Sequence, residues 1–388
     1  MANSWRRERW DSLRLLTPNW MTRLPGFEYA GPDEDGFMTA SEVVAFFDGY
    51  ASSFDAPVVE HTTVTRVAPA AAGSGFVVET DGGELRSRNV VLATGWCDVP
   101  AVPSLARDLS PRIHQVIPSG YRRPDDLDAG GVLVVGASAT GVQLAHELHM
   151  SGRPVTIAVG SHSRMPRTYR GMDSFWWLEL LGSFDRTVDA VADPRAARHE
   201  PSLQLVGSED HTTLDLTTLQ DIGVRLVGRL KAIDSTRAAF ATDVASVTAA
   251  ADSRMQSMLD RIDDAIDRLG LATEMLAPDR PAPVRPVQST SNLDLQQAGI
   301  TSIVWATGHR RAYHWLDLPI LDGRGEIVQY RGVTPMPGAY VLGQRFQHFR
   351  NSNFIDGVGR DALYVAQHIC RTPVYDDRAA ATSTPLPK

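Results

Sequence analysis

The stretch that decides the fold is Gly130-Gly131-Val132-Leu133-Val134-Val135-Gly136-Ala137-Ser138-Ala139-Thr140-Gly141-Val142-Gln143-Leu144-Ala145-His146-Glu147-Leu148. It begins with a short, continuous apolar run between glycines, which is typical of a parallel strand buried on both faces. It ends in a helix-like segment. Between the two, Gly136 to Gly141 reads G-x-S-x-x-G, a variant of the turn that holds a dinucleotide. The stretch therefore predicts a strand–turn–helix unit of an α/β fold.

The small residues of this turn have predicted roles. Gly136 makes the tight turn, Ser138 admits a pyrophosphate where a second glycine is usual, and Gly141 lets the helix pack on the strand. The pyrophosphate would rest on the helix N-terminus, with Ala139 and Thr140, because amide dipoles there favour negative charge. The alternative is a structural turn that binds no ligand.

The next strand, Val155-Thr156-Ile157-Ala158-Val159, is expected to end beside the adenosine ribose of a bound coenzyme. An NAD site places an acidic residue there to hold the 2′-hydroxyl. This chain has Gly160-Ser161-His162-Ser163-Arg164 instead, followed by Arg167 and Arg170. The arginines suit a 2′-phosphate, so NADPH is favoured over NADH, with Arg164 as the predicted ligand. The alternative is an ordinary solvated surface, where arginines are common.

Three further strands end on glycine. Val90-Val91-Leu92-Ala93-Thr94-Gly95 and Ile303-Val304-Trp305-Ala306-Thr307-Gly308 share an Ala-Thr-Gly ending, and Ala339-Tyr340-Val341-Leu342-Gly343 is the third. A glycine at the carboxyl end of a strand lets a ligand approach the backbone, and open α/β sheets bind ligands at that edge. The candidate cofactor-binding residues therefore include Thr94, Gly95, Thr307, Gly308 and Gly343.

A long amphipathic helix is predicted between Asp243 and Gly270. Apolar residues recur along it at helical spacing, aspartates lie mostly on the other face, and Gly270 marks its end. Such stripes are usually core faces, so the helix is expected to pack rather than to catalyse. The proline-rich stretch Pro278–Pro286 is expected to be a connector, and the tail from Arg378 onward is expected to be disordered.

Composition narrows the class of protein. The chain has 388 residues and a net charge of −8, with 43% hydrophobic residues, as in ordinary globular proteins. The acidic balance argues against nucleic-acid binding, and no apolar run reaches the roughly 18 residues that span a bilayer. Cys97 and Cys370 form no C-x-x-C pair, so neither a thiolate metal site nor a disulfide-reductase motif is indicated. Sparse cysteine and the lack of a visible secretory signal favour a cytoplasmic enzyme.

Segments at both ends of the chain resemble those of a known protein family. The chain opens with Ser4-Trp5-Arg6, Trp10-Asp11-Ser12-Leu13-Arg14-Leu15 and Thr17-Pro18, and it closes with Ser352-Asn353-Phe354-Ile355-Asp356-Gly357-Val358-Gly359-Arg360-Asp361-Ala362. With the two Ala-Thr-Gly strands, these segments resemble the two-dinucleotide-binding-domain flavoprotein monooxygenases, a class B flavin-containing monooxygenase-like family that uses FAD and NAD(P)H. The family includes relatives of Baeyer–Villiger, N-hydroxylating and plant auxin-forming enzymes. The resemblance covers nearly the whole chain.

The resemblance implies where a flavin would lie. In the family, the opening segment runs beside the flavin, and it holds Trp5, Arg6 and Thr17 here. The final segment, which holds Asp356 and Gly357 here, starts a helix whose amides face the pyrimidine end of the flavin and its ribityl chain. The flavin end is also expected to contact Thr94, Gly95 and Gly343.

Three departures from the family pattern bear on FAD. The first strand, G-x-G-x-x-G turn and helix of the family span roughly 30–35 residues, and Met1 stands just upstream of Trp5, so this FAD-binding segment is expected to be missing. The Phe, Gly and His of the family's linker motif are replaced, counting back from Tyr121, by Pro111, Ile113 and Ile117. The last strand ends Gly343-Gln344 instead of Gly-Asp. FAD binding is therefore expected to be weak.

The expected architecture is an α/β protein with two Rossmann-like domains. An NADPH-binding domain at 116–295 is inserted in an N-terminally truncated FAD-binding-like domain at 1–115 and 296–388. The resemblance implies that the protein uses NADPH, FAD and O2 to oxygenate a small organic substrate through a flavin peroxide, without a metal and without an assigned catalytic side chain. Two alternatives stay open: a non-catalytic NADP(H)-binding protein that has lost FAD, and a flavin-dependent reductase that makes no oxygenated product. No nucleic-acid or membrane partner is expected, and the oligomeric state, a homodimer included, stays open.

Overall fold

The computed structural model describes residues 1–71, 75–287 and 290–371, which form two compact units. The first unit comprises Met1–Val58, Val99–Arg186 and Val191–Arg310, and the second comprises Val59–Asp98, Thr187–Ala190 and Arg311–Lys388. The tail predicted to be disordered lies outside the described residues.

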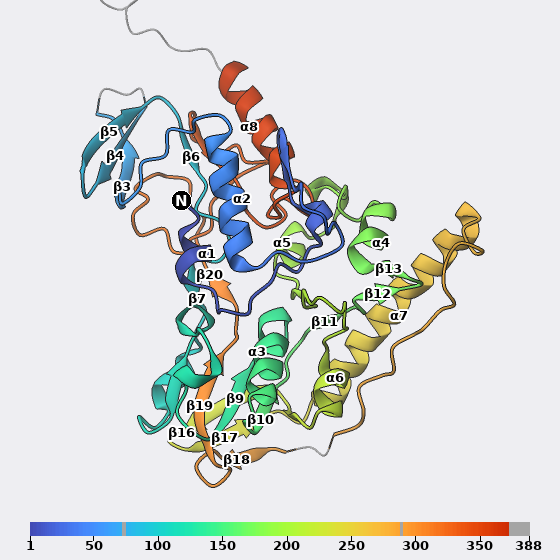
Figure 1. The fold of residues 1–388 in the computed structure, drawn as a ribbon. Coiled ribbons are helices and arrows are strands. Elements are labelled where there is room, and N and C mark those ends of the chain that lie inside the picture. The colour runs from blue at the N-terminus through green and yellow to red at the C-terminus, as the bar shows by residue number, and fades with distance from the viewer. Residues whose placement is uncertain (72–74, 288–289, 372–388) are drawn as a thin grey trace, which may run out of the picture. The chain divides into compact units, whose positions relative to one another are not determined.

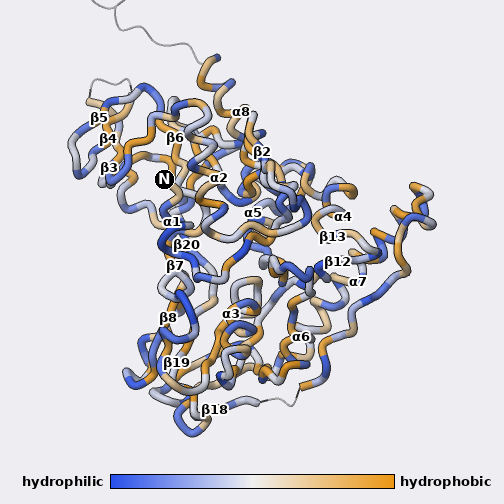
Figure 2. The backbone as a smooth tube through the Cα atoms, viewed as in Figure 1, coloured by the Kyte–Doolittle hydropathy of each residue, from blue (hydrophilic) through white to orange (hydrophobic). Residues whose placement is uncertain are grey.

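A five-stranded parallel sheet is the centre of the first unit (Figure 1). Its strand order is β15-β10-β9-β19-β8. The bounds are β8 His114–Val116, β9 Gly131–Val135, β10 Val155–Ala158, β15 Arg225–Val227 and β19 Ile300–Trp305. β9 and β10 are buried along their whole length, as their continuous apolar sequences predict. In Figure 2 the segments labelled β19 and α3 carry much of the hydrophobic colour.

Both faces of this sheet are covered. On one face, α3 (Ala139–Met150) shares a hydrophobic cluster with Val132, Val134 and Ile157 through Val142, Leu144 and Leu148. On the other face, Leu133, Val135 and Ile303 pack with residues of the antiparallel sheet β16 (Leu230–Asp234), β17 (Arg237–Phe240) and β18 (Asn292–Asp294). The β9–α3–β10 unit is the strand–turn–helix element that the glycine stretch predicts. The α/β fold class is confirmed.

The position of β19 differs from the predicted domain boundary. The prediction placed residues from 296 onward in an FAD-binding-like domain, yet β19 pairs in parallel with both β9 and β8. Its core residues Ile303 and Trp305 are buried in the sheet of the first unit. Thr307 and Gly308 therefore follow a strand of the five-stranded sheet, and the first unit extends to Arg310.

The predicted long helix is α7 (Val244–Leu269), drawn as a long yellow helix in Figure 1. Its apolar face contributes Met255, Leu259, Ile262 and Ile266 to a cluster that also contains Trp177 of α4 (Ser174–Leu180). Gly270 ends the helix in a left-handed conformation with φ 70°, as a glycine C-cap does. The predicted packing role of this helix is thus confirmed.

Shorter elements complete the first unit. α2 (Ala40–Ser52) begins with a capping box, in which the Thr39 side chain accepts from the Glu42 amide and Glu42 bonds back to the Thr39 amide. The remaining elements are α1 Asn3–Arg7, η1 Asn19–Met21, β1 Arg23–Leu24, β2 Phe27–Glu28, β7 Val99–Pro100, η2 Ser104–Asp108, η3 Pro118–Gly120, η4 Pro124–Asp126, β11 Ser163–Arg164, β12 Thr168–Tyr169, β13 Met172–Asp173, α5 Pro194–Arg198, β14 Leu203–Gln204, α6 Leu216–Asp221 and β20 His309–Arg310.

The second unit combines two small sheets and one helix. Its antiparallel sheet is β3 (Val64–Pro69), β4 (Phe76–Thr80) and β5 (Gly83–Ser87), and its parallel pair is β6 (Val90–Leu92) with β21 (Ala339–Val341). Val67, Phe76, Leu92 and Val341 belong to one hydrophobic cluster, which joins the two sheets. α8 (Val358–Arg371) follows, and η5 (Val188–Ala190) also lies in this unit. No helix in the described part of the chain is long and apolar enough to cross a membrane.

Candidate functional site: a dinucleotide turn at the carboxyl edge of the sheet

Two glycines fix the turn between β9 and α3. Gly136 has a φ of 113°, and a β-carbon there would lie 2.2 Å from the carbonyl oxygen of Ala306. A β-carbon on Gly141 would lie 1.9 Å from the carbonyl oxygen of Gly136. Both positions exclude any side chain, so the turn has the tight packing that the fingerprint requires.

The N-terminus of α3 offers amides to an anion. Ser138 is the N-cap residue, with extended φ and ψ of −84° and −173°, and its side chain makes no capping hydrogen bond. The first amides of a helix have no partner within the helix, and the helix dipole favours negative charge there. Ala139 and Gly141 are buried, while Ser138 and Thr140 are half-buried. The residues present therefore fit a pyrophosphate resting on this helix, as the sequence predicts.

Thr307 and Gly308 lie where the chain leaves β19. The Thr307 hydroxyl donates to the carbonyl of Ala101 at 2.9 Å, and the Ala101 amide donates to the carbonyl of Gly308 at 2.9 Å. Their neighbour Ala306 touches Gly136, so this Ala-Thr-Gly ending borders the dinucleotide turn. The structure thus places the second Ala-Thr-Gly strand in the five-stranded sheet, beside the glycine turn.

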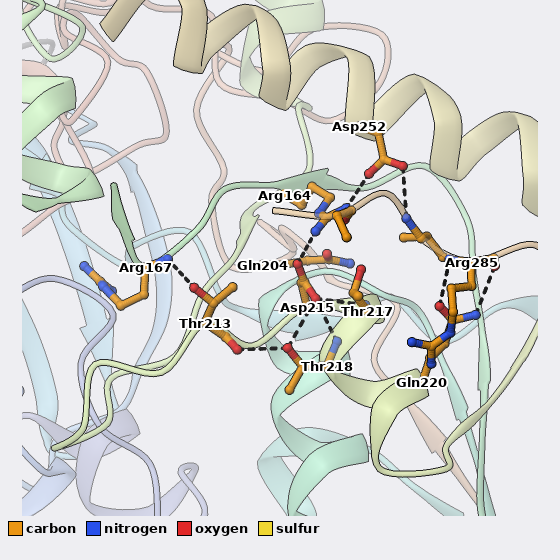
Figure 3. Close-up of polar contacts among 12 residues, drawn as sticks. Arg164, Arg167, Gln204, Thr213, Asp215, Thr217, Thr218, Gln220, Asp252 and Arg285 are labelled. Atoms are coloured by element: carbon orange, nitrogen blue, oxygen red, sulfur yellow. Dashed lines mark hydrogen bonds and ion pairs between the residues drawn. The ribbon is translucent and has the colours of Figure 1, made fainter. Parts of the chain in front are cut away.

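Arg164 is not placed where the sequence predicted it. Its side chain is fully buried and pairs with Asp215 and Asp252, each at 2.5 Å (Figure 3). It also donates to the carbonyl of Ala282 at 3.1 Å. Asp215 is itself the N-cap of α6 and accepts from the amides of Thr217 and Thr218. With its guanidinium enclosed by these carboxylates, Arg164 does not face a coenzyme, and the prediction that it binds a 2′-phosphate is wrong for this structure.

Arg167 is likewise an internal residue. Its guanidinium bonds both carboxylate oxygens of Asp173, at 2.8 and 2.6 Å, and donates to the carbonyl of Leu16 at 2.7 Å. Burial lowers the pKa of Arg167 and raises the pKa of Asp173, while the attraction between the two groups opposes both shifts. Sequence reasoning missed the two ion pairs of Arg164 because Asp215 and Asp252 are 51 and 88 residues away from it in the chain.

A different arginine lies at the carboxyl end of β10. Arg229 follows β15, the strand that pairs with β10, and its guanidinium donates to the hydroxyl of Ser161 at 3.2 Å. A β-carbon on Gly160 would lie 3.4 Å from Arg229 Nε, so the side chain crosses the loop after β10. Arg229 is exposed. No local sequence signal connects it to that loop, because Ser161 and Arg229 are 68 residues apart.

In the second unit, two glycines end the parallel strands β6 and β21. Gly95 and Gly343 both have a φ of 78°, and a β-carbon at either would meet no atom within 4 Å. Thr94 is exposed. Gln344 is buried, accepts from Arg311 at 2.6 Å, and donates to the carbonyl of Gly95 at 3.4 Å. The two strand ends are therefore joined through Gln344, and their backbones are open to a ligand.

The segment before α8 is also tightly folded. A β-carbon on Gly357 would lie 1.9 Å from the carbonyl oxygen of Asn351, and the side-chain Nδ2 of Asn351 donates to the Asp356 carboxylate at 3.2 Å. In the first turn of α8, Asp361 is fully buried, 3.8 Å from His348 Nδ1. Burial raises the pKa of the Asp361 carboxyl to about 6 and lowers the pKa of His348. The segment is followed directly by α8, as the resemblance implies, and its contact with a flavin stays a prediction.

The opening residues belong to the first unit. Trp5 and Arg6 lie on α1, where the Arg9 guanidinium is 5.3 Å from the centre of the Trp5 ring and Arg6 pairs with Asp48. Thr17 is half-buried ahead of Pro18. Contact of these three residues with a flavin stays a prediction.

The chain has an α/β fold whose parallel sheet and glycine turn are of the kind that binds dinucleotides in other proteins. Residues 25–173 match the model of the pyridine nucleotide-disulphide oxidoreductase family. An uncharacterized oxidoreductase CzcO-like from Geobacillus kaustophilus is 29% identical over 94% of this chain and 87% of its own length. Rice indole-3-pyruvate monooxygenase YUCCA1 is 28% identical over 45% of this chain and 43% of its own.

Solved structures show the same fold. The flavin-containing monooxygenase from Stenotrophomonas maltophilia is 16% identical, with a TM-score of 0.62 over 95% of this chain and 87% of its own. These matches agree with the resemblance noted in the sequence: a two-domain FAD/NADPH monooxygenase-like family fits the chain.

Proposed function

We propose that this chain is an NADPH-dependent flavoprotein monooxygenase that acts on a small organic substrate. The observation that carries the proposal is the turn from Gly136 to Gly141, where two positions exclude a β-carbon and the N-terminus of a twelve-residue helix follows. That turn fits a dinucleotide, and the family supplies the flavin chemistry. Bound FAD would accept a hydride from NADPH and activate O2, and the protein would supply binding and orientation.

The coenzyme would lie across the carboxyl edge of the five-stranded sheet. Its pyrophosphate would take amides of Ser138, Ala139 and Thr140. Its adenosine would extend toward the loop after β10, where Arg229 already bonds Ser161. An exposed guanidinium there suits a 2′-phosphate, because it can add charge-assisted hydrogen bonds. NADPH is therefore the proposed coenzyme, with Arg229 in the role first predicted for Arg164.

FAD would be held in part by the second unit. The candidates there are Thr94 and Gly95 after β6, Gly343 after β21, and Asp356 and Gly357 at the start of α8. By family resemblance, Trp5, Arg6 and Thr17 are also candidate flavin contacts. These groups would hold the flavin end of the cofactor and orient it, and none of them is assigned a proton-transfer role.

Within residues 1–388, FAD is expected to be held weakly. β6 and β21 form only a two-stranded parallel pair, and Val91 at its middle is 40% exposed, whereas parallel strands are ordinarily buried on both faces.

The deciding experiment titrates FAD into the purified chain, then adds NADPH without O2, and then admits O2 with candidate substrates. Bleaching of the flavin followed by an oxygenated product supports the proposal. Bleaching without any oxygenated product identifies a reductase, and NADP⁺ binding without FAD binding identifies a nucleotide-binding module. Stoichiometric FAD in the protein as purified would contradict weak binding.

A further inference from the structure

A buried glutamine contacts the dinucleotide turn from outside it. Gln204 on β14 is fully buried, and its amide nitrogen donates to the carbonyl oxygen of Ala137 at 2.5 Å. Ala137 is the second residue of the G-x-S-x-x-G turn, and the two residues are 67 positions apart in the chain. A side chain from a distant segment thus donates a hydrogen bond to a backbone oxygen inside the glycine turn.

This bond constrains the direction of an amide that a phosphate would use. In a trans peptide, the carbonyl of one residue and the N–H of the next lie in one plane and point in opposite directions within it. Holding the Ala137 carbonyl toward Gln204 therefore turns the Ser138 N–H the other way. A carbonyl rotated away from Gln204 would present its oxygen, rather than an N–H, to an anion.

The strand that carries Gln204 is itself held by the buried ion pairs. β14 pairs in parallel with β11, and Arg164 is the register partner of Gln204. Arg164 is held in turn by Asp215 at the start of α6 and by Asp252 on α7 (Figure 3). Breaking a buried pair of this kind leaves uncompensated charge, so the arrangement resists displacement.

We propose that Gln204 is a positioning residue of the coenzyme site, which sets the Ala137–Ser138 peptide for a pyrophosphate, and that Arg164, Asp215 and Asp252 hold it in place. The inference rests on the proposed NADP(H) site. It gives Arg164 a part in coenzyme binding without contact to the coenzyme.

The test compares two ligands by calorimetric titration. NADP⁺ has a pyrophosphate that would meet the turn, whereas 2′-AMP has the 2′-phosphate and no pyrophosphate. Gln204→Met, which keeps length and removes the donor, should weaken NADP⁺ about tenfold, as expected for one lost hydrogen bond near a charged group. Its affinity for 2′-AMP should stay unchanged. The matched control is Gln143→Met, because Gln143 is also buried and donates to the carbonyl of Leu205, outside the turn, at 2.8 Å.

A second variant separates positioning from folding. Glu at position 204 can donate to the Ala137 carbonyl when it is protonated and cannot when it is ionised. The affinity of Gln204→Glu for NADP⁺, relative to that of wild type at the same pH, should fall as the pH rises. Its affinity for 2′-AMP should equal that of wild type at every pH.

The outcomes distinguish the two proposals. A wild-type protein that binds no NADP⁺ refutes the coenzyme site itself. If wild type binds NADP⁺, the Gln204 inference is overturned by unchanged NADP⁺ affinity in Gln204→Met, by equal losses for both ligands, or by a Gln204→Glu deficit that is independent of pH.

Discussion

The carbonyl oxygen of Gly136 lies 1.9 Å from the position that a β-carbon on Gly141 would take. Gly141→Ala must therefore move α3 away from the turn, and we expect a stability loss of about 1–3 kcal/mol from overpacking. NADP⁺ binding should be lost in the same variant, measured by titration beside thermal unfolding. Gly323→Ala is the control, because a β-carbon there meets no atom within 4 Å. A soluble Gly141→Val protein with undiminished NADPH binding would remove this turn from the site.

Arg229→Ala should discriminate between the two nicotinamide coenzymes. Losing a hydrogen bond between charged groups costs about 1.5–3 kcal/mol, so NADPH affinity should fall by that amount and NADH affinity should not change. Dissociation constants for both coenzymes, measured by fluorescence titration, test this. Arg225→Ala is the control, because Arg225 lies at the opposite, amino end of β15. Equal losses for both coenzymes would exclude Arg229 from the 2′-phosphate site.

Arg164→Met should lower the free energy of unfolding. Asp215 and Asp252 would lose their shared cation while they stay largely buried, and removing one partner of a buried ion pair costs about 3–5 kcal/mol. Urea denaturation measures this loss. The exposed pair between Arg285 and Asp221 supplies the control, since Arg285→Met should cost no more than about 1 kcal/mol. Unchanged stability combined with a selective loss of NADPH affinity would restore the sequence-based role of Arg164.

Asp361 should make the stability of the second unit depend on pH. Its pKa is raised by burial to about 6 in the folded protein, above the ordinary value of 3.8. The folded state therefore binds its proton more tightly, and this stabilisation is complete below about pH 4 and is lost as the pH rises through 6. The change amounts to about 3 kcal/mol at 1.36 kcal/mol per pKa unit.

Asp361→Asn should remove that slope, which denaturant unfolding at several pH values between 4 and 7 would show. The comparison with wild type isolates Asp361 from His348, whose lowered pKa acts in the opposite direction: its contribution is lost as the pH falls. Parallel stability curves for wild type and Asp361→Asn would show that the carboxyl does not titrate in this range.

The local elements of the fold could be predicted from the sequence. The run Val132–Val135, the turn from Gly136 and the helix after it follow from apolar pattern and glycine spacing, which act between near neighbours in the chain. The same holds for α7, whose stripe and terminal Gly270 define its length. The place of β19 between β9 and β8 could not be predicted in this way, because strand order depends on pairing between distant segments.

The same distinction between local and long-range contacts applies to the residues of the candidate site. The need for glycine at positions 136 and 141 could be predicted because the constraint is local, whereas their contact with a coenzyme stays a prediction. Arg164 was misassigned because a basic residue after β10 looks the same in sequence whether it faces solvent or two buried aspartates. Arg229 and Gln204 were missed because each reaches its partner from a segment more than sixty residues away.

The placement of β19 also governs when this sheet can form during synthesis. β9 and β10 are complete by residue 158, but β19, which lies between β9 and β8, ends only at residue 305. Until the ribosome has released that segment, β9 carries an unpaired edge in a nascent chain, and such edges invite association with other chains. Parallel pairing over so long a sequence separation is also intrinsically slow. Expression that stops or stalls before residue 300 should therefore yield aggregated product, whereas full-length chains close the sheet.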